Sequence, residues 1–88
     1  MIEILLYTRR DCHLCDAMKE IVERARRDLP SRLSCVDVDS RPELAREYGE
    51  EVPVLFVNER KFAKFRVDPR RLREKLTSEI RAGAISGR

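Results

Sequence analysis

The stretch YTRRDCHLC, residues 7–15, places two cysteines three positions apart where an apolar run gives way to a helical pattern. The run, residues 2–7, is rich in strand-forming residues and predicts a strand covered on both faces. Apolar residues then recur at helical spacing and predict a helix over residues 12–28, with Asp11 as its N-cap. The stretch therefore predicts a strand–helix unit with both cysteines in the first helical turn.

Two thiols at this spacing in a helical turn are close enough to form a small-ring disulfide. Unpaired backbone N–H groups and the helix dipole at a helix start favour the thiolate form of Cys12, which is the form that attacks disulfides. Cys15 lies one turn inside the helix, where it can attack a mixed disulfide formed on Cys12. The pattern predicts a dithiol redox centre in which Cys12 attacks and Cys15 resolves.

The remainder of the chain alternates strand and helix signals. The expected strands cover residues 33–38, 52–57 and 61–65, and the last two form a hairpin. A short helix begins at Pro42 and ends before Gly49, where we expect a left-handed backbone, and a longer helix begins at Asp68-Pro69 with Leu72, Leu76 and Ile80 facing inward. We expect one domain over residues 1–82 and a flexible tail over residues 83–88.

Composition limits the function classes. A chain of 88 residues makes one small domain, and 42% hydrophobic residues suffice for a core. The net charge of +3 comes from interspersed acids and bases, so we expect no nucleic-acid binding. The first residues lack the features of a secretory signal and of a membrane span, and we expect a cytoplasmic monomer without membrane contact.

Three stretches together resemble a small glutaredoxin-like member of the thioredoxin-fold superfamily, over Ile2 to about Ile80. The resemblance implies an α/β, thioredoxin-like β-α-β-α-β-β-α fold, with a four-stranded mixed sheet flanked by helices. It also implies a disulfide oxidoreductase without a cofactor. The matching stretches are Leu6-Tyr7-Thr8 leading into Cys12-His13-Leu14-Cys15, then Val36-Asp37-Val38-Asp39, and Val52-Pro53-Val54-Leu55-Phe56-Val57.

The resemblance also implies substrate contacts. Pro53 is expected to follow a cis peptide bond beside the dithiol, with the Val52 backbone pairing with the substrate. Arg9 and Arg10 are expected to attract an anionic carboxylate, and His13 lies beside them. The substrate is a disulfide-bearing protein or a small thiol.

Two departures from glutaredoxins concern the hairpin and the loop after it. Ala63-Lys64 replaces a glycine pair that lets glutathione approach, and Arg66-Val67 replaces acidic residues. Glutathione is therefore expected to be a poor reductant. The expected electron donor is a protein such as thioredoxin or its reductase, or a low-molecular-weight thiol bound in another way.

Alternative interpretations remain beside the enzyme. A binding module of the same fold would leave the cysteines redox-idle. A metal or iron–sulfur carrier needs about four ligands, and only His13 and Cys35 remain as soft candidates, so no metal site is predicted. We expect Cys35, in a predicted strand, to be buried as a small apolar residue.

Overall fold

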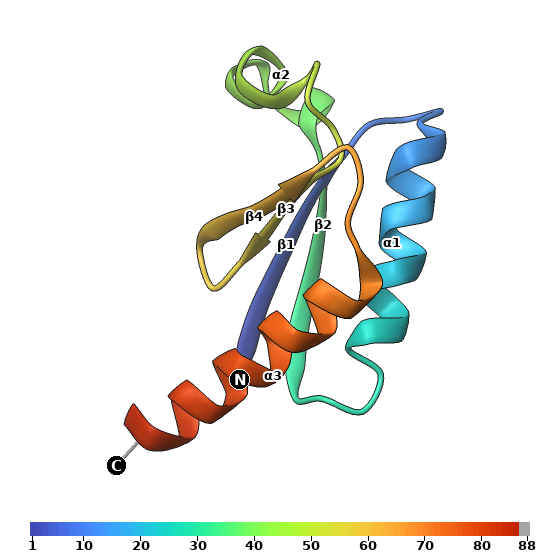
Figure 1. Ribbon diagram of the computed structural model, residues 1–88. Helices are drawn as coiled ribbons and strands as arrows, with labels where there is room; N and C mark the ends of the chain where they lie inside the picture. Colours follow the sequence, from blue (N-terminus) through green and yellow to red (C-terminus); the bar gives the residue numbers. More distant parts are fainter. Residues whose placement is uncertain (87–88) are drawn as a thin grey trace.

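Strand β1 (Ile2–Thr8) lies in the interior of a four-stranded sheet whose strands follow the order β2-β1-β3-β4 (Figure 1). The computed structural model describes residues 1–86 of the chain. The other elements, in chain order, are α1 (His13–Ala25), β2 (Ser31–Asp37), the 3-10 helix η1 (Val38–Ser40), α2 (Pro42–Tyr48), β3 (Val54–Val57), β4 (Arg60–Lys64) and α3 (Pro69–Ser86).

The sheet is mixed, as predicted. β1 pairs in parallel with β2 and antiparallel with β3, and β4 adds to the free edge of β3. The two-residue turn between β3 and β4 has positive φ at both Asn58 (49°) and Glu59 (69°), which matches the twist of a tight hairpin. The predicted order of elements and the α/β class are confirmed.

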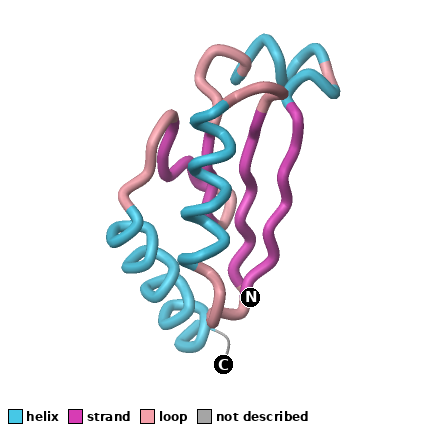
Figure 2. The backbone as a smooth tube through the Cα atoms, turned by 90° about the vertical axis from the view of Figure 1, so that its right-hand side faces the viewer, coloured by secondary structure: helices cyan, strands magenta, loops and turns pink. Residues whose placement is uncertain are grey.

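Helices α1 and α3 cover one face of the sheet, and the core lies between them and the strands (Figure 2). Removing this apolar surface from water is the main stabilising term for a chain of this size. Leu72 and Leu76 are fully buried and Ile80 packs against the core cluster, which confirms the inward face predicted for the last helix. The buried cluster consists of Ile2, Ile4, Leu6, Met18, Val22, Ala25, Leu55, Val57, Leu72 and Leu76.

The second face of the sheet is only partly covered, so the prediction that β1 is covered on both faces is wrong. Along β1, buried residues alternate with half-buried or exposed ones. The reason is the position of α2, which has seven residues and lies beyond the end of the sheet (Figure 1). It reaches the second face through Tyr48, whose ring stacks on Tyr7 at 4.6 Å between centroids and meets Phe56 edge-on at 6.0 Å.

The ends of the helices differ from the predicted ends. Helix α1 is capped by Cys12 and not by Asp11, because Asp11 occupies a turn with φ of 55°. The end of α1 at Ala25 comes three residues before the expected one. Helix α3 continues to Ser86, so residues 83–86 of the expected tail are helical, and residues 87–88 lie outside the described residues.

Gly49 is the other local correction. Its φ of −55° is right-handed, so the predicted left-handed helix end is wrong. In the part of the chain that the structure describes, no helix combines the length and apolar character needed to cross a membrane.

Candidate active site

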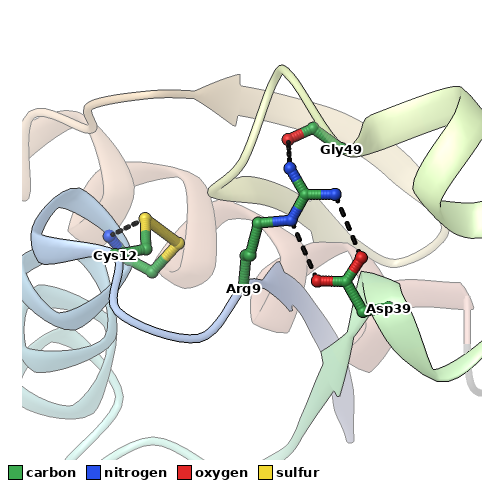
Figure 3. Close-up of a disulfide and its surroundings, with 5 residues drawn as sticks. Arg9, Cys12, Asp39 and Gly49 are labelled. Atoms are coloured by element: carbon green, nitrogen blue, oxygen red, sulfur yellow. Dashed lines mark hydrogen bonds and ion pairs between the residues drawn. A yellow bond between two sulfur atoms is a disulfide. The ribbon is translucent and has the colours of Figure 1, made fainter.

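The junction between β1 and α1 carries a disulfide between Cys12 and Cys15, whose Cα atoms lie 5.2 Å apart (Figure 3). Cys12 is the N-cap residue of α1, and its sulfur accepts a hydrogen bond from the backbone N–H of Cys15 at 3.1 Å. The same N–H would stabilise a negative charge on that sulfur after reduction, together with the helix dipole. The geometry therefore favours Cys12 as the thiolate of the pair.

The two cysteines differ in their access to solvent. Cys12 is half-buried, whereas the Cys15 residue is only 2% exposed and packs within the protein. A molecule that approaches the disulfide from outside therefore meets Cys12 first. This asymmetry agrees with the predicted order of attack by Cys12 and resolution by Cys15.

Loops from three parts of the chain meet beside the disulfide. The Val52-Pro53 peptide bond is cis, as the resemblance implied, with Pro53 buried and Val52 half-buried. The carbonyl oxygen of Pro53 accepts a hydrogen bond from the N–H of Phe65 at 2.9 Å, which ties the α2–β3 loop to the β4–α3 loop. Leu14, between the two cysteines, lines the same small pocket as Phe65, so the start of α1 lies against this loop.

The Arg9 side chain makes contacts within the chain that the sequence analysis did not predict. Its guanidinium donates two hydrogen bonds to the Asp39 carboxylate, both 3.0 Å long, and a third to the carbonyl oxygen of Gly49 at 2.9 Å. Figure 3 shows the guanidinium directed toward these two residues and away from the disulfide. Arg9 thus links the end of β1 to η1 and to the end of α2, and its charge is already paired.

The other predicted contact residues lie on the surface. Arg10 and His13 are exposed, and neither forms an ion pair among residues 1–86. Arg10 is therefore the one of the two neighbouring arginines whose charge is available to an anionic partner.

Asp39 and Gly49 are the site residues that the sequence analysis did not find. Thr8 and Asp37 pair at the ends of parallel strands β1 and β2, so residues just beyond them lie close together. An arginine after one strand and an acid after its parallel neighbour is the signal that could have paired Arg9 with Asp39.

Glycine is required at position 49 because other atoms of the protein approach its Cα closely, and not because its backbone is left-handed. A Cβ atom at this position would overlap the backbone oxygen of Ala45 and would lie 2.8 Å from the Arg9 guanidinium. A side chain here would therefore displace either the end of α2 or the Arg9 contact.

The Arg9–Asp39 pair predicts a pH-dependent stability. The hydrogen bond from Arg9 lowers the pKa of Asp39 below its ordinary value of 3.8. A lowered folded-state pKa means that the stabilisation is complete above the unfolded-state value and is lost as pH falls through the folded one. Asp39→Asn should therefore lower the urea midpoint of unfolding near neutral pH, and the difference from the parent protein should shrink in strong acid.

A matched control for this experiment is Glu59→Gln. Glu59 is exposed and forms no ion pair among the described residues, so its replacement should move the urea midpoint little at either pH. An Asp39→Asn difference that stays the same from neutral to strongly acidic pH would show that the ion pair does not contribute to stability.

Cys35 is exposed, which corrects the expectation that it is buried. Cys35 lies on β2, an outer strand of the sheet, whereas its pairing partner Leu6 on the interior strand β1 is fully buried. Within residues 1–86, no group of three His, Cys, Asp or Glu side chains is arranged to hold a metal ion.

The comparison with protein families gives one match. A family model described as "Glutaredoxin-like domain (DUF836)" matches residues 3–77. None of the curated proteins matches the chain.

Solved structures show the same arrangement of elements. A structural-genomics target protein from X. campestris is 35% identical, with a TM-score of 0.71 over 85% of this chain and 96% of that one. A protein from Nitrosomonas europaea is 25% identical, with a TM-score of 0.71 over 85% and 91% of the two chains. A thioredoxin from Halobacterium salinarum, 23% identical, has a TM-score of 0.63 over 88% and 73%. The fold of this chain is thioredoxin-like.

Proposed function

The chain belongs to the glutaredoxin-like domain family (DUF836), and on that premise we propose that it is a thiol–disulfide oxidoreductase acting through Cys12 and Cys15. The single observation that carries the proposal is the pairing of these cysteines in one disulfide at the start of α1, with Cys12 half-buried and Cys15 buried. A redox-idle binding module would have no need for this asymmetry.

The reaction starts from the reduced dithiol. The Cys12 thiolate attacks one sulfur of a substrate disulfide, a mixed disulfide forms, and the other substrate sulfur leaves as a thiolate that takes up a proton. Cys15 then loses its proton and attacks the Cys12 sulfur, which releases the second substrate thiol. The substrate gains two electrons and two protons, and the protein is left with the Cys12–Cys15 disulfide.

A thiol donor must return the protein to its reduced form. We assign this role to a protein dithiol such as thioredoxin or to its reductase, because Lys64 and Arg66 stand where glutaredoxins provide a glycine and an acid for glutathione. The Lys64 side chain lies 3.7 Å from the Glu51 carboxylate, and Arg66 supplies a positive charge instead of a partner for an ammonium group. We further propose a monomer that works in the cytoplasm, where thiols are kept reduced.

A redox-buffer titration tests the proposal by counting free thiols per chain. The chain has three cysteines, so the reduced protein should show three thiols, and oxidation should leave one, that of Cys35. The two site thiols should disappear together at a single redox poise, because they form one disulfide. If the three thiols were oxidised independently at different redox poises, the proposed function would be contradicted. Zinc or a coloured cluster bound to the purified protein would instead favour a metal or iron–sulfur carrier.

A further inference from the structure

The β4–α3 loop presents an exposed aromatic side chain beside the disulfide. Phe65 is 41% exposed, and its φ of 68° is unusual for a bulky residue. The N–H of Arg66 donates to the carbonyl oxygen of Lys64 at 2.7 Å, which closes a strained three-residue turn around Phe65. The bond from the Phe65 N–H to Pro53 holds this turn in place. Strain that persists next to a reactive centre is a mark of a functional role.

An apolar notch lies between this loop and the first turns of α1. Its volume is about 180 Å³, which suits one aliphatic or aromatic side chain. Leu14, which lies between the two cysteines, lines one end of the notch, and Ala17 and Ile21 line it further along α1, so the notch starts at the cysteine motif. The notch is lined by Leu14, Ala17, Met18, Ile21, Phe65, Arg66 and Val67.

A second hollow lies on the other side of the same loop, between β4 and α3. It measures about 610 Å³, and Arg66 and Val67 line both hollows. Four cations surround it, namely Lys64, Arg66, Arg71 and Lys75, against the acids Asp68 and Glu74.

Two of these cations have no acidic partner. Arg66 and Arg71 form no ion pair within residues 1–86, whereas Lys64 and Lys75 are paired with Glu51 and Glu79. Of the two acids, Asp68 already accepts a hydrogen bond from the N–H of Arg70 at 2.9 Å. The hollow therefore has an excess of positive charge and is complementary to a carboxylate.

We propose that the loop of residues 65–67 is a docking element for a polypeptide substrate that carries an apolar side chain next to its disulfide and an acidic residue farther along. The apolar side chain occupies the notch against Phe65 and Leu14, and the carboxylate pairs with Arg66 and Arg71. This inference deepens the proposed function and rests on it, since it names the substrate class of the same site. A small disulfide cannot occupy both hollows at once and gains nothing from them.

Three peptides of equal length, each with one internal disulfide, test the proposal. The first has Phe beside a cysteine and two Glu residues beyond it, the second has Lys in place of Glu, and the third has Ala in place of Phe. At low salt, pre-reduced protein should reduce the first peptide about fivefold faster than either of the others. The preference for Glu should fall at high salt, where exposed ion pairs are screened.

Charge and aromatic variants assign the two contacts. Arg66→Glu should make the Lys peptide a better substrate than the Glu peptide. Arg81→Glu is the control: it makes the same charge change on α3 but outside both hollows, so the protein should still prefer the Glu peptide. The Phe65→Asn protein lacks the aromatic contact and should reduce the Phe peptide no faster than the Ala peptide. Asparagine is chosen because it tolerates positive φ and therefore keeps the turn. Arg81→Glu, which lies outside both hollows, should also reduce hydroxyethyl disulfide like the parent protein.

Docking is also measured without chemistry. A Cys12→Ser/Cys15→Ser double variant is titrated with fluorescent peptides in which serine replaces cysteine, and binding should follow the same order of preference. Equal reduction and equal binding of all three peptides would overturn the docking proposal and leave the redox function standing. Selective binding without any disulfide reduction would overturn the redox function and leave the docking element.

Discussion

Replacing Cys12 with serine is expected to abolish disulfide reduction, with a loss on the order of a thousandfold or more, as when other enzymes lose their nucleophile. Replacing Cys15 with serine is expected to leave the first attack intact and to stop the reaction at a mixed disulfide on Cys12. The structural reason is that Cys12 caps α1 and is reachable, whereas Cys15 is 2% exposed. The two variants therefore fail at different steps.

Mass spectrometry of the variants after incubation with a disulfide peptide checks this prediction. The Cys15→Ser protein should carry one peptide attached to Cys12, and the Cys12→Ser protein should carry none there. Cys35→Ser is the matched control, because Cys35 is exposed and could otherwise collect peptide unspecifically. A mixed disulfide that forms on Cys15 in the Cys12→Ser protein at the parent rate would reverse the assignment.

Two glycine replacements are expected to change stability in opposite directions. Gly49→Ala should lower the free energy of unfolding by about 1–3 kcal/mol, because its Cβ overlaps the Ala45 carbonyl and the Arg9 guanidinium. Gly83→Ala should raise it by about 0.5–1 kcal/mol, because Gly83 lies within α3 and an added Cβ meets nothing within 4 Å.

Urea unfolding of the two variants under identical conditions measures both effects. Because the substitution is the same, the comparison removes the general advantage of alanine over glycine in the unfolded chain. Equal shifts for the two variants would show that Gly49 is not constrained by the close approach of Arg9. If the clash with the Arg9 guanidinium outweighs the clash with the Ala45 carbonyl, the Arg9→Ala/Gly49→Ala double variant should regain part of the stability that Gly49→Ala loses.

The parts of the site that lie within one stretch of sequence were predictable. Cys12 and Cys15 are three positions apart on a helix whose start is marked by the change from a strand pattern to a helical one, so their proximity follows from local geometry. The order of elements along the chain and the mixed character of the sheet were also predictable, because a strand–helix–strand unit and a hairpin leave few arrangements. The resemblance supplied the cis bond before Pro53.

Side-chain pairing between distant segments was not predictable from local pattern. Arg9 and Asp39 are 30 residues apart, and their contact depends on β1 and β2 ending side by side. The same contact explains the error at Gly49, where a glycine after a helix suggested positive φ but an incoming arginine was the true constraint.

Exposure also depends on position in the sheet. Cys35 lies on an outer strand, and β1 has a poorly covered second face because α2 lies beyond the end of the sheet. An apolar residue in a strand pattern predicts a strand, but only the packed structure shows which face and which edge receive a covering helix.

The left-handed turn at Phe65 lowers the stability of the fold at the position that the docking proposal uses for substrate contact. A backbone of this kind around a bulky residue costs on the order of 1–3 kcal/mol, and glycine would adopt it without penalty. A search for thermostable variants would therefore select glycine here early, and the more stable protein would have a smoother surface with weaker discrimination between partners. Phe65 should therefore be kept in any variant designed for substrate selectivity rather than for stability.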